Sequence, residues 1–78
     1  MEDKIYQVVG RVLRVPVEML DKESSPDTVE SWDSAKHMDL MMSLEQEFGV
    51  QFNDEHIIEM MNVGLIIETI KELYKDKK

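Results

Sequence analysis

Residues 33–49 read DSAKHMDLMMSLEQEFG, and this stretch carries the signals of one complete helix. It opens on Asp33, a residue type that caps helix starts, and it closes on Gly49, a type that ends helices. Between them, one stripe of side chains recurs at the helical period. Its members are His37, Leu40, Met41, Leu44 and Phe48. We therefore expect a helix over residues 34–48 that packs this stripe in a core.

Upstream, an apolar stripe of the same period predicts a first helix from Asp3 to about Leu13. Its members are Ile5, Val8, Val9, Val12 and Leu13. Asp3 is the expected N-cap. Because proline lacks an N–H group and disfavours helical backbone in the residue before it, Pro16 should end this helix before Val15.

Downstream, residues 50–52 look extended, and Asn53 or Asp54 should cap a short helix that reaches Met60. Asn62 should cap a final helix with another apolar stripe. That stripe consists of Val63, Ile66, Ile67, Ile70, Leu73 and Tyr74. The pattern predicts an all-α fold, a small bundle of three main helices plus one short helix.

The connection from Val15 to Asp33 is long for so small a chain. Long loops in compact domains are often functional. Apolar side chains should hold this loop against the core, and one helical turn is compatible with residues 17–20. The expected anchors are Val17, Met19, Leu20 and Val29. With this loop between the first and second helices, residues 1–78 form a single predicted domain.

The composition limits the chemistry that the chain can perform. It has 78 residues, no cysteine and a formal net charge of −8 from 17 acidic and 9 basic residues. The lack of cysteine excludes disulfides and thiolate metal sites. The acidic surface disfavours nucleic acid and anionic lipid and favours basic protein partners, although solubility alone explains it equally well. No signal peptide or membrane-spanning stretch is present, so we expect a cytoplasmic protein.

The helix predicted over residues 34–48 has a second apolar face. Its members are Ala35, Met38 and Met42, with Asp39 and Glu45 at its edges. Methionine side chains adapt to several partners, so this face suits a docking surface. The alternative is that these methionines simply widen the core contact. Met60 and Met61 fit either arrangement.

Ser34 follows Asp33 in the first turn of the same helix. Free backbone N–H groups and the positive end of the helix dipole favour a phosphate at such a position. The hydroxyl is therefore a suitable attachment point for a phosphodiester. Serine is also common at helix starts for purely structural reasons, so position alone leaves both interpretations open.

Residues 32–50, WDSAKHMDLMMSLEQEFGV, resemble the signature of acyl carrier proteins. That family has Asp-Ser-Leu at the start of its second helix and a run like Leu-Glu-Glu-Glu-Phe at the end, and the resemblance covers nearly the whole chain. It implies a covalent 4′-phosphopantetheine arm on Ser34 and a monomeric protein. It also implies that the partners are a phosphopantetheinyl transferase and acyl-transferring or acyl-modifying enzymes with basic docking surfaces. The docking residues it implies are Asp33, Ala35, Met38, Asp39, Met42 and Glu45.

The chain departs from the family pattern around this signature. Ala35 replaces the usual leucine, Trp32 stands where glycine is frequent, and Pro26 falls near a frequent phenylalanine. Lys36 and His37 make the helix start less acidic than is usual. Attachment at a serine hydroxyl does not depend on these residues. They favour a specialised carrier over an ordinary carrier of fatty acid synthesis.

The expected function is that of an acyl carrier protein, which holds acyl groups as thioesters and presents them to enzymes of fatty acid, polyketide or related biosynthesis. We do not expect an enzyme, because His37 and His56 are the only histidines and no nucleophile, base and orienting group form a set. No zinc or calcium pattern is present. The alternative from another class is an acidic helical adaptor that uses the methionine-rich face without a prosthetic group.

Overall fold

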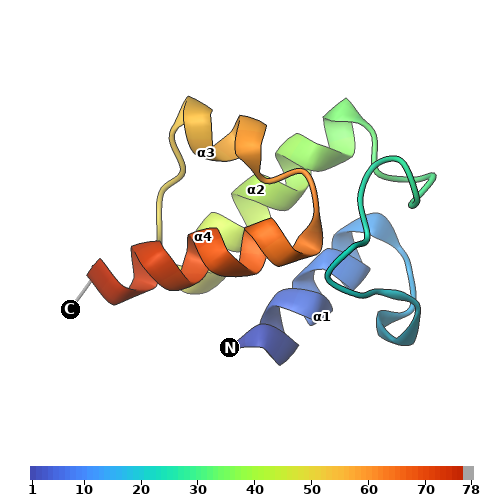
Figure 1. The fold of residues 1–78 in the computed structure, drawn as a ribbon, viewed down its shortest axis with the longest axis horizontal. Coiled ribbons are helices and arrows are strands. Elements are labelled where there is room, and N and C mark those ends of the chain that lie inside the picture. The colour runs from blue at the N-terminus through green and yellow to red at the C-terminus, as the bar shows by residue number, and fades with distance from the viewer. Residues whose placement is uncertain (77–78) are drawn as a thin grey trace.

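The computed structural model describes residues 1–76, and over these residues the chain is all-helical. Figure 1 shows α1 (Glu2–Leu13), α2 (Ser34–Phe48), α3 (Asp54–Glu59) and α4 (Val63–Asp76), and the long loop contains the 3₁₀ turn η1 (Val17–Met19). The predicted bundle of three main helices and one short helix is confirmed. None of the described helices is long and apolar enough to cross a membrane.

Local signals place both ends of α2 where the sequence predicts them. The Asp33 carboxylate accepts a hydrogen bond from Lys36 N–H, with Oδ1 and N 2.8 Å apart. Gly49 ends the helix in the left-handed conformation, at a φ of 65°. Glycine adopts this conformation without the steric cost that a Cβ would add.

The other helix starts confirm one expectation and correct another. Asn53 and His56 form a reciprocal capping box at the start of α3, with bonds of 2.8 and 3.2 Å. α1 begins at Glu2, and its N-cap is Met1, which makes no side-chain bond. The prediction of Asp3 as N-cap is wrong, because Asp3 lies inside the first turn, where its charge faces the positive helix end without capping it.

The core forms between the three long helices. Its buried apolar side chains are Ile5, Val8, Val9, Leu13, Leu40, Met41, Leu44, Val63, Ile66, Ile67 and Ile70. The predicted stripe of α2 is thus confirmed, with His37 and Phe48 half-buried at its two ends. Of the two methionines that fitted either role, Met60 is buried and Met61 is about half exposed.

Apolar contacts hold the long loop at positions that only partly match the prediction. Leu20 is buried and Val29 packs half-buried on the core, as expected. Val17 and Met19 are wrong as anchors, since they are 43 and 71 % exposed. The η1 turn formed by residues 17–19 leaves these side chains in solvent, and Trp32, 2 % exposed, anchors the loop instead.

Hydrogen bonds join the same loop to the start of α4. The N–H groups of Val63 and Gly64 donate to the carbonyl oxygens of Ser24 and Lys22, at 3.0 and 2.9 Å. These are first-turn donors that lack partners within the helix. A Cβ on Gly64 would lie 3.2 Å from the Lys22 carbonyl oxygen, so glycine permits this close approach.

Candidate functional site

Ser34 is the first residue of α2, and its side chain is exposed. The first N–H groups of a helix have no partner within the helix. Asp33 satisfies the N–H of Lys36, and within residues 1–76 no acceptor contacts the N–H groups of Ser34 and Ala35. The Ser34 hydroxyl therefore lies beside unpaired backbone donors at the positive end of α2. An anionic group on this oxygen would be stabilised there.

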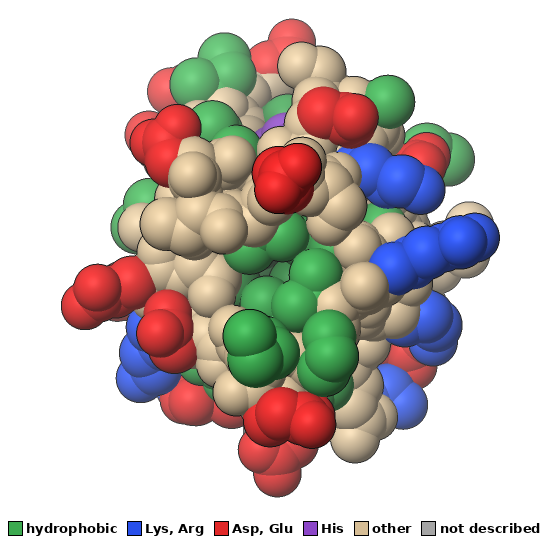
Figure 2. All heavy atoms as spheres, turned by 90° about the vertical axis from the view of Figure 1, so that its right-hand side faces the viewer, with side chains coloured by type: hydrophobic (Ala, Val, Ile, Leu, Met, Phe, Trp, Pro, Cys, Tyr) green, Lys and Arg blue, Asp and Glu red, His purple; other side chains and the backbone are tan. Residues whose placement is uncertain are grey.

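The second face of α2 is solvent-exposed, as a docking surface requires. Met38 and Met42 are 47 and 56 % exposed, and Ala35 and Asp39 are exposed beside them. The alternative that these methionines widen the core contact is therefore excluded. Figure 2 shows the end of the molecule that carries the long loop, where apolar side chains gather near the centre, with acidic side chains above, below and to their left and Lys and Arg side chains along the right-hand edge.

Glu45 differs from the other residues of this face. It is half-buried, and its carboxylate Oε2 accepts a hydrogen bond from Phe52 N–H at 2.8 Å. The bond ties α2 to the segment over residues 50–52 that leads to α3. Glu45 thus has a structural role that the sequence did not reveal, and its docking role stays a prediction.

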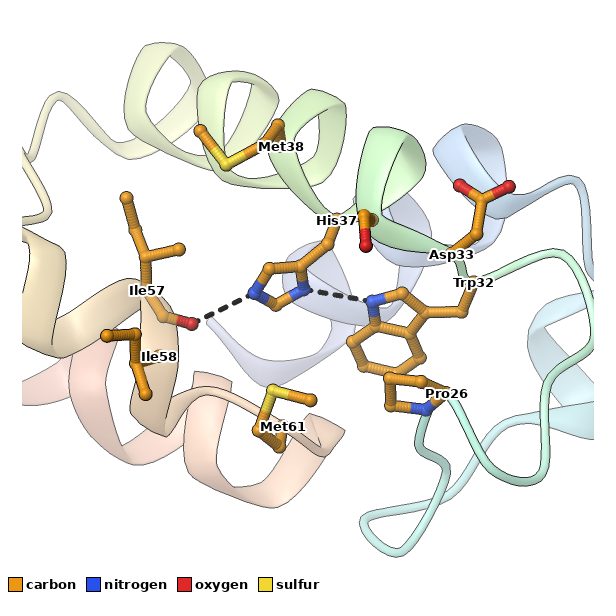
Figure 3. Close-up of a pocket in the computed structure, with 9 residues that line it drawn as sticks. Pro26, Trp32, Asp33, His37, Met38, Ile57, Ile58 and Met61 are labelled. Carbon is orange, nitrogen blue, oxygen red and sulfur yellow. Dashed lines mark hydrogen bonds between the residues drawn. The ribbon is translucent and has the colours of Figure 1, made fainter.

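A pocket of about 540 Å³ lies beside Ser34, between α2, α3 and the end of the long loop (Figure 3). Much of its lining is apolar. Besides Ser34, the lining includes Met38, Ile58, Met61, Pro26 and Trp32. We call this pocket the outer groove. Ile58 and Met61 are 70 and 47 % exposed, so the groove opens to solvent.

A hydrogen-bonded imidazole forms part of the same lining. Trp32 Nε1–H donates to His37 Nδ1 at 3.0 Å, and His37 Nε2 lies 2.9 Å from the carbonyl oxygen of Ile57 in α3. His37 is half-buried, and both of its ring nitrogens have hydrogen-bond partners. Neither partner, Trp32 or Ile57, was predicted from the sequence. The one available signal was that Trp32 stands just before the helix and His37 follows five residues later in its first turns.

The arrangement does not resemble a catalytic triad. Both ring nitrogens of His37 are engaged away from Ser34, and His56 is used in the cap of α3. Among the described residues, no group of three or more His, Cys, Asp or Glu side chains could hold a metal ion. What the site offers is an exposed hydroxyl at a helix start, an adjoining groove and an acidic, methionine-bearing face.

Comparison with known proteins assigns this arrangement to a family. Residues 3–70 match the family model described as "Phosphopantetheine attachment site". An acyl carrier protein of Buchnera aphidicola subsp. Schizaphis graminum is 32 % identical over 79 aligned residues, which cover 100 % of this chain and 96 % of that protein. The solution NMR structure of a holo acyl carrier protein from Geobacter metallireducens superposes with a TM-score of 0.87 at 25 % identity, covering 97 % of this chain and 87 % of the other.

The sequence and structure matches agree with each other over nearly the whole chain. They confirm the resemblance to acyl carrier proteins, with phosphopantetheine as the cofactor. They leave no support for the adaptor that lacks a prosthetic group. The chain belongs to the phosphopantetheine attachment site family and is a non-catalytic carrier of the acyl carrier protein type.

Proposed function

We propose that Ser34 carries the 4′-phosphopantetheine arm. The observation that supports this most strongly is the position of its hydroxyl, which is exposed at the first residue of α2 beside unpaired N–H groups. A negative charge at such a position gains roughly 0.3–1 kcal/mol from the helix dipole. The resemblance to the carrier signature, in which the family's modified serine matches Ser34, also supports this proposal.

The surroundings of Ser34 fit this group. The helix start suits the charged phosphodiester, and the outer groove offers apolar contacts from Met38, Ile58 and Met61. The bound arm supplies a thiol, which this chain lacks because it contains no cysteine. Tethering keeps an acyl group at high effective concentration for several enzymes in turn.

We also propose that the exposed face of α2 is the docking surface for partner enzymes. It consists of Asp33, Ala35, Met38, Asp39, Met42 and Glu45. Its acids fit the basic docking surfaces expected of a phosphopantetheinyl transferase and of acyl-transferring or acyl-modifying enzymes, and would make their association fast and salt-sensitive. Its methionines can adapt to partners of different shape.

The pathway we favour is a specialised one, related to fatty acid or polyketide biosynthesis. The support lies in the residues that differ from the usual carrier pattern around the site, above all Trp32 and His37. Both face the groove where cargo attached to Ser34 would lie. A single carrier domain over residues 1–78, a monomeric state and a cytoplasmic location stay predictions.

Transfer of the arm tests the assignment of Ser34. The apo protein is incubated with coenzyme A and a broad-specificity phosphopantetheinyl transferase, and the intact mass is measured. We expect an increase equal to one arm in the natural protein and in Ser43→Ala, a control in the same helix, and no increase in Ser34→Ala. Modification of Ser34→Ala, or no modification of any variant by several transferases, would refute the assignment.

A charge placed on the proposed docking surface tests the second proposal. Met42→Glu should slow arm transfer about fivefold or more, because the residues whose loss costs over about 1 kcal/mol cluster near the centre of an interface. Met19→Glu is the matched control, since Met19 is 71 % exposed and belongs to η1 and not to α2. Circular dichroism checks that both variants keep their helices. Equal rates for the two variants would contradict the proposal.

A further inference from the structure

The His37 imidazole joins the end of the long loop, α2 and α3 (Figure 3). The indole nitrogen of Trp32 is a donor only, so His37 Nδ1 must be unprotonated and accept its hydrogen bond. The neutral ring then carries its proton on Nε2, which donates to the Ile57 carbonyl oxygen. Both nitrogens are used, and the ring lies at an interplanar angle of 24° to the indole.

The bond to Ile57 adds to a small set of anchors for α3, in which the half-buried Ile57 side chain packs on the core and the buried Met60 follows the helix. α3 contains six residues, none of which is buried. The carbonyl oxygen of Ile57 lies in the last turn of the helix, where carbonyl groups have no partner within the helix. His37 therefore satisfies one end group of α3 and fixes this short helix on α2.

The outer groove ends at this contact. Trp32, His37 and Ile57 line it, whereas Met41 and Met60 belong to the core and do not. Met41 follows His37 by about one turn on the same face of α2. The imidazole thus lines the groove one turn before a core methionine of α2, and Met41 and Met60 are themselves 1 and 0 % exposed.

We infer that His37 is a positioning residue that keeps a short acyl chain, tethered at Ser34, in the outer groove and out of the core. The inference rests on the proposed attachment at Ser34. With His37 in place, α3 stays against α2 and the chain meets only the groove side chains. Without it, α3 can separate from α2, and the flexible side chains of Met41 and Met60 can rearrange around an entering chain.

Methionine methyl groups report directly on this placement, because Met38 and Met61 line the groove while Met41 and Met60 lie in the core. Protein with ¹³C-labelled methionine methyls is loaded from octanoyl coenzyme A by the transferase, and loading is verified by intact mass. Isotope-edited NOE spectra then show which methyls contact the octanoyl chain. The same measurement is made on two substitutions of His37.

In the natural protein we expect contacts to Met38 and Met61 only. In His37→Ala we expect contacts to Met41 or Met60, and amide exchange in α3 about tenfold faster, because one hydrogen bond that holds the helix is lost. His37→Gln should restore the natural pattern, since its amide offers one donor and one acceptor.

Several results would overturn the inference. These are contacts to the core methionines in the natural protein, an unchanged contact pattern in His37→Ala, or unchanged amide exchange in α3. Should His37→Ala not fold, Trp32→Phe releases one side of the imidazole, keeps an aromatic ring in place and should shift the contacts in the same direction. Failure of the natural protein to take up the arm would instead refute the proposed function, and the mass measurement separates the two cases.

Discussion

Asp33 has two separable roles, and replacing it by asparagine and by alanine measures each of them. Its carboxylate caps α2 through the 2.8 Å bond to Lys36 N–H, and its charge is part of the proposed docking surface. Asparagine caps a helix about as well as aspartate but carries no charge, whereas alanine provides neither. Both variants therefore lack the negative charge, but only Asp33→Asn keeps a side chain that can cap the helix.

The cap determines stability. Asp33→Ala should lower the free energy of unfolding by about 1 kcal/mol, the usual value of an N-cap side chain. For a chain of this size, that loss corresponds to a fall in Tm of roughly 4–8 °C. Asp33→Asn should unfold within a few tenths of a kcal/mol of the natural protein. Urea titration followed by circular dichroism measures both values.

The negative charge of Asp33 should determine how fast the protein associates with the transferase. A carboxylate about 4 Å from a partner's cation in water contributes about 1 kcal/mol, or roughly fivefold in rate. Both variants should accept the arm from coenzyme A about fivefold more slowly at low salt, and the difference should shrink as salt is added. If Asp33→Asn loses as much stability as Asp33→Ala, the cap assignment is wrong. If Asp33→Asn accepts the arm at the natural rate, the carboxylate only caps.

Three further outcomes follow from burial, hydrogen bonding and charge. Met60→Ala should lower the free energy of unfolding in urea by about 2–5 kcal/mol, whereas Met61→Ala should change it by at most about 0.5 kcal/mol. Equal losses for the two variants would contradict the finding that Met60 is buried and Met61 is not. Trp32→Phe should cost about 1–3 kcal/mol because it removes the donor to a half-buried ring nitrogen, and ¹⁵N shifts of the natural imidazole should show a proton on Nε2 only. The hydrogen bond from Lys71, with the positive charges of Lys71 and Lys22, lowers the pKa of Glu2. The ionised Glu2 carboxylate therefore stabilises the fold above the pKa it has in the unfolded chain, and this stabilisation is lost as pH falls through its pKa in the folded protein. Lys71→Gln should raise the pKa of Glu2, which a carboxyl NMR titration measures.

Elements with local signals at both ends were predictable from the sequence. α2 matches its predicted bounds because a capping side chain and a glycine in the left-handed conformation each act within a few residues. The first residue of α1 was not predictable in this way, since Asp3 is compatible with the cap and with the first turn alike. The choice depends on whether Met1 and Glu2 continue the helix, which no strong local preference decides.

The loop anchors failed for a different reason. Apolar character identified Val17 and Met19, but whether an apolar side chain is buried depends on the turn that carries it, and η1 leaves both exposed. The anchoring role of Trp32 was not predicted, because this residue stands outside any periodic stripe. A single residue beside a helix start gives no pattern, although its side chain is large enough to anchor a whole loop.

Some residues of the candidate site were predictable from the sequence, and others were not. Ser34 and the exposed methionines follow from helix geometry, which fixes the face of each residue once the helix is known. The partners of His37 and the bond from Phe52 to Glu45 depend on how separate segments meet. The contact of His37 with Ile57 joins residues 20 apart in sequence and has no local signal, so only the folded arrangement reveals it.

The ion pairs of the described residues lie away from the end of α2 where Ser34 is found. The ion pairs among the described residues join α1 to the far end of α2, through Lys4, Arg11 and Glu47, and α1 to α4, through Lys71 and Glu2. The start of α2, where Ser34 lies, has none of them and is fixed by a cap and by the core. Opposite it stands α3, which has no buried residue. His37 links the two, because its ring nitrogen bonds the carbonyl oxygen of Ile57 and so holds one wall of the outer groove next to the helix start that bears Ser34.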